Sequence, residues 1–143
     1  MLEVQTITKA ELQQYMIVGF QDDVELLNRF HHKPGSLQGC VHATMKNVEE
    51  CASLMPLQYY RLVLNEKPIG FTITGPAILY SFGINIKFRT KELVLEWFNK
   101  MKEMLRNDFR VVLYNINERA IRFFERNGME NIHQDKEYTI LVL

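Results

Sequence analysis

The sequence predicts a single α/β domain in which helices pack against a mixed sheet. Its length of 143 residues matches about one domain. The composition, 47% hydrophobic and 24% charged, is ordinary for a globular chain that buries its own core. In the second half, strand-like and helix-like segments alternate, which implies crossover connections and a partly parallel sheet. We therefore divide the single domain into a helical arm, residues 1–57, and a sheet-bearing half, residues 58–143.

The arm is predicted to begin with a short strand, residues 4–8, and to continue as helices. Thr8 and Glu11 have the spacing of a capping box, in which a hydroxyl and a carboxylate each bind an amide at a helix start. Acidic residues open a second helix in a similar way at residues 22–25. The Pro-Gly pair at residues 34–35 then breaks this helix.

A third helix is predicted after Ser36, whose hydroxyl can cap the first turn. Its apolar residues recur at intervals of three and four, so they share one helical face. They are Val41, Met45, Val48, Ala52 and Met55. Pro56 ends the helix, because proline cannot continue a helical hydrogen-bond pattern.

The second half is predicted to hold the sheet. Alternating, β-rich segments bounded by turns indicate its strands. The strand ranges are residues 58–64, 69–74 and 77–88, followed later by 109–114 and 137–143. Thr90 caps a helix that runs to about residue 106. Another helix spans residues 115–127, and Gly128 closes it.

Charge and cysteine content exclude several classes of protein. Lys plus Arg and Asp plus Glu are both 17, so the net charge is zero, which argues against binding nucleic acid or a membrane surface through bulk charge. No apolar run approaches the ~20 residues of a membrane span, and no signal peptide is visible, so we expect a cytoplasmic protein. The arm residues His31, His32, Cys40, His42 and Cys51 lack zinc-site spacing, so no metal is predicted.

Three stretches resemble one family, the GCN5-related N-acetyltransferases (GNAT). Residues 65–71 are similar to that family's hairpin between its second and third strands, and residues 84–89 to the end of its fourth strand. Residues 117–129 carry an Asn, an Ala, an aromatic pair and a Gly at the offsets of its fourth helix. The resemblance implies a GNAT-like fold with a mostly antiparallel sheet, although the arm has a third helical stretch where the family usually has two.

The resemblance also implies a site for acetyl-CoA. In the family, backbone amides at a helix start bind the pyrophosphate, and small residues let the phosphates approach. Here Arg89 matches the motif, but Glu92 and Val94 stand where the family has Gly, and Gly or Ala. We expect weak binding, and an ordinary capped helix is the alternative. The cofactor-binding residues implied are Arg89, Thr90, Lys91, Leu93, Val94 and Asn117.

The groups that the family often uses for proton transfer are missing. The strand at residues 77–88 has no carboxylate, and Phe124 stands at the position of the family's tyrosine acid. Tyr114, at the end of a predicted strand, is the best remaining proton donor. Asn115 has capping-box spacing with Glu118, so it is predicted to cap the last helix and to leave Asn117 for the cofactor.

By resemblance, we expect an acetyl-CoA-dependent N-acyltransferase that acts on a small-molecule or protein amine. The alternative is a catalytically silent module of the same fold that acts by protein–protein interaction. We expect no nucleic-acid or membrane partner, and a homodimer is possible. A basic stripe on the last helix, Arg119, Arg122 and Arg126, is either a solvated face or a contact for the cofactor's 3′-phosphate.

Overall fold

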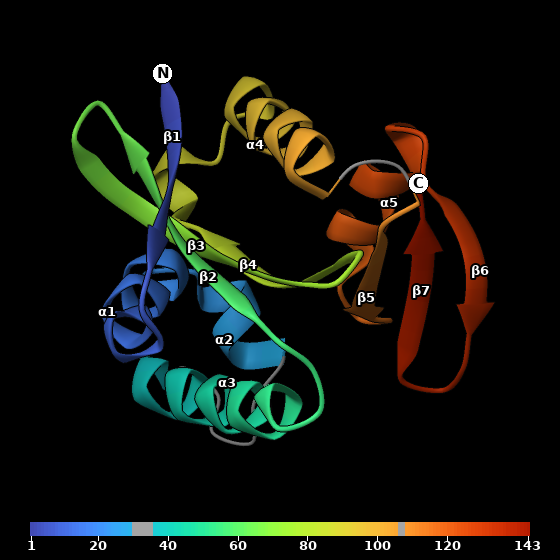
Figure 1. The fold of residues 1–143 in the computed structure, drawn as a ribbon, viewed down its shortest axis with the longest axis horizontal. Coiled ribbons are helices and arrows are strands. Elements are labelled where there is room, and N and C mark those ends of the chain that lie inside the picture. The colour runs from blue at the N-terminus through green and yellow to red at the C-terminus, as the bar shows by residue number, and fades with distance from the viewer. Residues whose placement is uncertain (30–35, 106–107) are drawn as a thin grey trace.

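The computed structural model describes residues 1–29, 36–105 and 108–143 (Figure 1). It contains one seven-stranded sheet in the order β1-β2-β3-β4-β5-β7-β6. The strands are β1 (Leu2–Ile7), β2 (Gln58–Leu64), β3 (Lys67–Gly75), β4 (Ile78–Ile84), β5 (Arg110–Tyr114), β6 (Glu130–Gln134) and β7 (Tyr138–Val142). All described neighbours pair antiparallel except β4 and β5, which are parallel. The predicted mixed, mostly antiparallel sheet is therefore confirmed.

The helices cover both faces of this sheet (Figure 1). They are α1 (Lys9–Phe20), α2 (Val24–Arg29), α3 (Leu37–Ala52), α4 (Lys91–Leu105) and α5 (Glu118–Arg126). One buried cluster lies between the arm helices and β3, and the other lies beneath α4 and α5. No helix in the described ranges combines the length and the apolar character needed to cross a bilayer. The predicted break at residues 34–35 lies outside the described residues.

Two strand predictions were wrong. The third strand of the meander ends at Ile84 instead of residue 88, and a short 3₁₀ helix, η1 (Ile86–Phe88), follows. Asn85 ends the strand, because its buried side chain donates to the Val18 carbonyl and accepts from the Lys87 amide. Strand β6 was not predicted, because all of its residues are exposed and no apolar alternation marks it.

Helix α1 packs against the sheet through three glycines. A side-chain carbon added to Gly19 of α1 or to Gly70 of β3 would collide with the backbone of Gly83 on β4, and one added to Gly83 would collide with the Phe71 ring. A Cβ built on Gly70 would lie 1.9 Å from the Gly83 carbonyl oxygen, and one on Gly19 would lie 2.8 Å from the same atom. This contact sets the distance between α1 and β4. It therefore also sets the position of the turn that follows α1.

We expect Gly70→Ala to lower the free energy of unfolding by at least about 2 kcal/mol, because the backbone must move to admit the methyl group. Gly128→Ala is the matched control. It adds the same methyl group in open space and costs only ~1–2 kcal/mol for its φ of +99°. Urea unfolding of both variants measures the difference. A Gly70→Ala protein as stable as the wild type would contradict the packing described here.

Candidate functional site

The site forms where β4 and β5 part. The two strands pair only through Ile78 with Arg110 and Leu79 with Val111. Directly after Leu79, the β3–β4 register shifts, so that Tyr80 is an extra residue opposite β3. Such a bulge bends its strand and increases its twist. Beyond this point, no β4–β5 pair is formed, and the gap between the strands opens toward their carboxyl ends.

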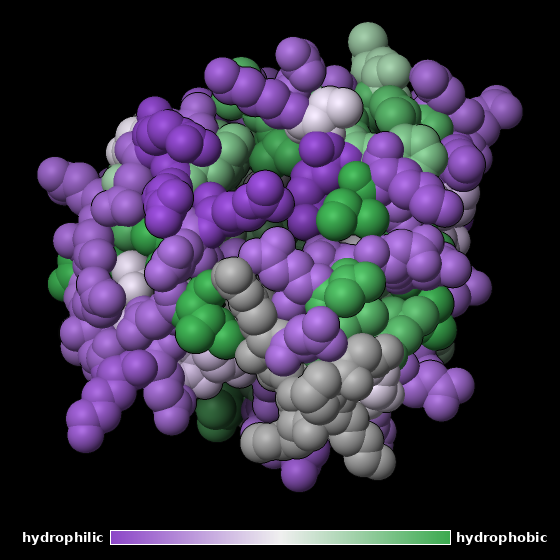
Figure 2. Space-filling model, turned by 180° about the vertical axis from the view of Figure 1, so that it is seen from behind, coloured by the Kyte–Doolittle hydropathy of each residue, from purple (hydrophilic) through white to green (hydrophobic). Residues whose placement is uncertain are grey.

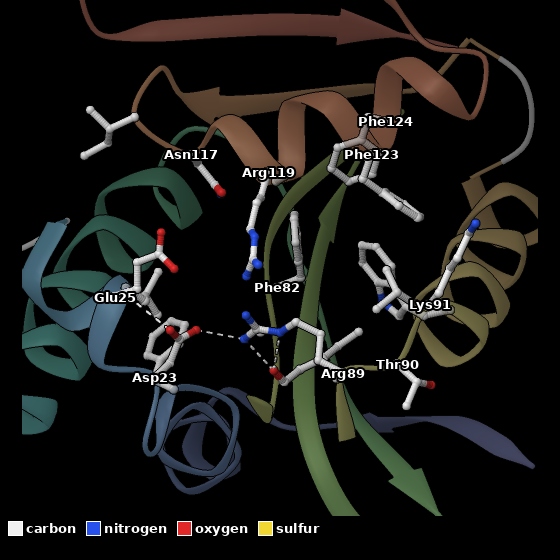
Figure 3. Close-up of a pocket in the computed structure, with 18 of the residues that line it drawn as sticks. Asp23, Glu25, Phe82, Arg89, Thr90, Lys91, Asn117, Arg119, Phe123 and Phe124 are labelled. Atoms are coloured by element: carbon white, nitrogen blue, oxygen red, sulfur yellow. Dashed lines mark hydrogen bonds and ion pairs between the residues drawn. The ribbon is translucent and has the colours of Figure 1, made fainter. Parts of the chain in front are cut away.

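A cavity of about 520 Å³ lies at this opening (Figure 3). Its volume is in the range of small-molecule sites. Its walls come from β4, from the start of α4, from α5 and from the turn between α1 and α2. Residues of the arm and of the sheet-bearing half, which are far apart in the sequence, therefore line the same cavity.

Five of the six residues implied for the cofactor line this cavity. They are Arg89, Thr90, Lys91, Val94 and Asn117. Leu93 does not line it, because its side chain is buried in the core beneath α4. Glu92 also lies elsewhere, on the outer face of α4 beside Leu95 and Glu96. The residue that stands at the family's glycine position therefore lies away from the cavity, whereas Val94 is part of the cavity wall.

The start of α4 presents backbone amides to the cavity. Thr90 caps the helix, since its hydroxyl accepts from the Leu93 amide at 3.2 Å and its carbonyl accepts from the Val94 amide at 3.0 Å. The amides of Lys91 and Glu92 donate to no other group within the described ranges. Two such donors at a helix N-terminus favour an anion.

Arg89 binds within the protein. Its guanidinium forms an ion pair with Asp23 at 2.8 Å and donates to the Ile84 carbonyl at 2.8 and 3.2 Å. Asp23 is only 4% exposed, and its other oxygen accepts from the Leu26 amide at the start of α2. Arg89 thus fastens the α1–α2 turn to the end of β4. Sequence analysis missed Asp23, because nothing local relates it to Arg89 across 66 residues.

Helix α5 contributes further positive charge. Arg119 and Arg126 line the cavity and form no hydrogen bond or ion pair with any group in the part of the chain described. Figure 3 shows the Arg119 side chain reaching from α5 toward Arg89. Arg122 differs, because it pairs with Glu118 at 3.3 Å. The predicted basic stripe is therefore divided between the cavity and an ion pair on the helix surface.

The deep wall of the cavity is aromatic. The Phe82 ring lies 4.8 Å from the Trp97 ring and 5.8 Å from the Phe124 ring, measured between centroids. The Trp97 indole N–H donates to the buried Thr72 hydroxyl at 2.9 Å, which fixes this wall against the sheet. Phe124 is 1% exposed, so the position of the family's tyrosine acid is apolar here.

The prediction that Asn115 caps the last helix was wrong. Helix α5 begins at Glu118, with Asn117 at the cap position. The Asn115 side chain instead makes two other hydrogen bonds. Its Nδ2 donates to the Asp135 carbonyl at 2.8 Å, and its Oδ1 accepts from the Thr139 hydroxyl at 2.6 Å. Asn115 therefore holds the β6–β7 hairpin. The Asn117 side chain makes no cap hydrogen bond and extends into the cavity (Figure 3).

Tyr114 lies beyond the cavity, at the carboxyl end of β5. Its ring is 4.9 Å from that of Tyr138 on β7. A hydrogen bond with Tyr114, together with burial, raises the pKa of Tyr138 to about 12. Burial also raises the pKa of Tyr80, on the bulge, to about 12. Tyr80 and Tyr138 therefore stay protonated and neutral at physiological pH.

Among the described residues no group of three or more His, Cys, Asp or Glu is placed to hold a metal.

The surface around the site is mixed. Figure 2 shows polar residues over most of this face, with separate hydrophobic areas near its centre. Several exposed apolar side chains belong to the elements that form the site, including Val24 of α2 and Ile116 before α5. The approach to the site is therefore neither uniformly charged nor uniformly apolar.

Comparison with solved structures identifies the fold. An acetyltransferase from Thermus thermophilus matches with a TM-score of 0.72 and 15% identity, over 99% of this chain and 96% of that one. A nucleotide-linked sugar GNAT matches with a TM-score of 0.64 and 14% identity, over 99% and 85%. An aminoglycoside acetyltransferase in complex with coenzyme A and kanamycin matches with a TM-score of 0.64 and 16% identity, over 99% and 95%. No family model and no curated protein matches the chain. The chain has the GNAT acetyltransferase fold, as its sequence predicts.

We expect Arg89→Ala to lower the free energy of unfolding by about 1–3 kcal/mol, because it leaves the Asp23 carboxylate buried without its cation. This is less than the ~3–5 kcal/mol of a fully buried pair, since the Arg89 side chain is 33% exposed. Arg89→Ala combined with Asp23→Asn should cost less than the sum of the single changes. Lys87→Ala is the control, because Lys87 and Asp22 form an exposed pair at 3.5 Å worth less than ~1 kcal/mol. Equal effects of Arg89→Ala and Lys87→Ala in urea unfolding would refute this role.

Proposed function

We propose that this chain is an acetyl-CoA-dependent N-acyltransferase that acts on an amine. The observation that carries the proposal is the cation-lined cavity where β4 and β5 part, in a chain with the GNAT acetyltransferase fold. The aminoglycoside acetyltransferase of the same fold is a complex with coenzyme A, which supports a nucleotide thioester as the ligand. Bound acetyl-CoA would supply the activated acyl group.

The residues around the cavity fit a polyanionic cofactor. The Lys91 and Glu92 amides would bind a phosphate at the start of α4, and the Lys91, Arg119 and Arg126 side chains would neutralise charge around it. Asn117 offers an amide group that no helix cap occupies. Val94 narrows the approach to the backbone, which supports weak binding. In the family's motif, small residues strengthen phosphate binding by letting the phosphates approach the backbone. Here, side-chain cations would supply part of that binding.

Acyl transfer to an amine forms a C–N bond and breaks the C–S bond. The amine releases one proton to solvent, and the departing sulfur takes one. We propose Tyr114 as the donor of that proton. The Tyr114 ring lies against that of Tyr138, and a hydrogen bond between the two residues raises the pKa of Tyr138, so a neutral phenol stands beside the proposed donor. No acid is required beyond this, because positioning a neutral amine already lowers the barrier.

A second candidate is a catalytically silent module of the same fold that acts through a protein partner. Three features favour it: the branched Val94 side chain is part of the cavity wall, Arg89 is paired with Asp23, and Phe124 carries no hydroxyl. Binding of coenzyme A separates the two candidates, since a silent module needs no cofactor.

We expect acetyl-CoA to stabilise the protein. A ligand present at a hundred times its Kd raises the free energy of unfolding by ~2.7 kcal/mol. This raises Tm by roughly 5–10 °C in a domain of this size. Arg119→Ala should weaken binding about tenfold, because it removes a cation that faces the cavity. Val94→Ala should tighten binding. Glu92→Gln is the control and should bind as the wild type does, because Glu92 lies on the outer face of α4. The absence of any Tm shift at millimolar acetyl-CoA would favour the silent module.

We expect Tyr114→Phe to lower kcat at least tenfold while the Kd for acetyl-CoA stays the same. The substitution removes only the hydroxyl that would protonate the sulfur, and general acids contribute ~10²–10⁴-fold to rates. Thiol release with a panel of primary amines measures kcat, and calorimetry measures Kd. Tyr60→Phe, on β2, removes the hydroxyl of a tyrosine that does not line the cavity and serves as the control. An unchanged kcat for Tyr114→Phe would exclude Tyr114 as the donor.

A further inference from the structure

Three tyrosines gather on the α3 side of the sheet, at the mouth of the gap between β4 and β5. Tyr80 comes from β4, Tyr114 from β5 and Tyr138 from β7. The rings of Tyr114 and Tyr138 are in contact, with 4.9 Å between centroids and a tilt of 31°. Tyr80 follows Leu79, which pairs with Val111 of β5, so Tyr80 comes just after the last β4–β5 pair, on the strand that borders the gap. We call these three residues the tyrosine cluster.

The cluster is anchored on one side and open on the other. The Tyr80 hydroxyl donates to the Asn47 carbonyl of α3 at 3.1 Å, so α3 holds the Tyr80 ring in place. Tyr114 is 40% exposed, which leaves much of its ring available for contact. Tyr80 is the extra residue of the bulge. The bulge at which the gap opens therefore also sets the orientation of the Tyr80 ring.

The surroundings of the cluster are apolar. Val112 and Ile140 are paired across β5 and β7, and they share the sheet face of Tyr114 and Tyr138 by strand alternation. Both are half-buried. Ile116, 47% exposed, lines the cavity two residues beyond Tyr114. An apolar surface therefore leads from the tyrosine cluster to the mouth of the cavity.

Several carboxylates near the site already have partners. Asp22 pairs with Lys87, and Asp23 pairs with Arg89. On the β6–β7 side, Asp135 accepts from the amides of Glu137 and Tyr138 and lies 3.5 Å from the His133 imidazole. A ligand with several positive charges would have to compete with these partners.

We propose that the acceptor is a primary amine with one positive charge and an aromatic body, and that the tyrosine cluster binds this body. The inference rests on the proposed function, because it assigns the second substrate of the same site. Aromatic rings pack against other rings in offset or edge-on contacts, and the phenol faces attract an ammonium group. An amine held there would lie beside the gap through which it must reach the acyl carbon.

The test compares three probes: 2-phenylethylamine, its uncharged analogue 2-phenylethanol, and spermidine. Calorimetry measures the binding of each to the protein alone and to the protein saturated with coenzyme A. We expect 2-phenylethylamine to bind at least fivefold more tightly than spermidine in one or both states, and 2-phenylethanol to bind more weakly than 2-phenylethylamine. Amide chemical shifts of the wild type should change at β5 and β7 when 2-phenylethylamine is added.

Variants of Tyr114 separate the ring from the hydroxyl. Tyr114→Phe keeps the ring, so the Kd for 2-phenylethylamine should stay within about twofold of wild type. Tyr114→Ala removes the ring and should raise this Kd about fivefold to tenfold, the range expected for a lost aromatic contact. Tyr60→Ala is the matched control and should leave the Kd unchanged, since Tyr60 lies on β2 between Thr6 and Thr72.

Each result has a definite meaning. Tighter binding of spermidine, no binding of 2-phenylethylamine in either state, or shifts confined to other elements would overturn the inference. So would an unchanged Kd for Tyr114→Ala. If Tyr114→Ala does not fold, the wild-type shifts and the order of the three probes decide alone. Failure of coenzyme A to bind would overturn the proposed function, whereas its binding without 2-phenylethylamine would overturn only this inference.

Discussion

The separation of β4 from β5 is the constraint on which the rest of this structure depends. Parallel strands normally continue side by side, but these two share only the pairs at Ile78 and Leu79 before the bulge at Tyr80 turns β4 away. The backbone groups beyond the bulge face an opening instead of a neighbouring strand. The cavity, the cations on its walls and the tyrosine cluster all lie around this opening, so one extra residue in β4 determines where the cavity forms.

Charge is distributed around the opening in a way that a motif alone does not describe. Arg89 occupies the position where the family's motif has Arg or Gln, yet its guanidinium holds the α1–α2 turn through Asp23. Positive charge for a ligand comes from the start of α4 and from α5 instead. The buried Asp23 makes this division necessary, since a carboxylate 4% exposed requires a cation. Arg89 is thus paired within the protein, whereas Arg119 and Arg126 line the cavity.

Sequence patterns predicted the fold well because period and turn chemistry are local. The order of most elements along the chain followed from apolar spacing, turns and caps, and the GNAT-like architecture was implied by the resemblance of three stretches, residues 117–129 among them. Strand β6 escaped prediction, because an exposed edge strand carries no apolar alternation. The pairing of Arg89 with Asp23 escaped it as well, because tertiary contacts leave no local signal. The direction of Glu92 was open to prediction: its neighbour Leu93 belongs to the buried face of α4, so a side chain one position away points elsewhere.

The short pairing between β4 and β5 also divides the sheet mechanically. Strands β1 to β4 form one antiparallel ladder, and β5, β7 and β6 form another, with two residue pairs as the seam between them. Elements joined by few hydrogen bonds open at lower free energy than the ladders on either side. The line between the two ladders is therefore where the sheet would bend most easily. Small rotations of the β5–β7–β6 ladder about that line would change the width of the cavity and leave every antiparallel hydrogen bond intact.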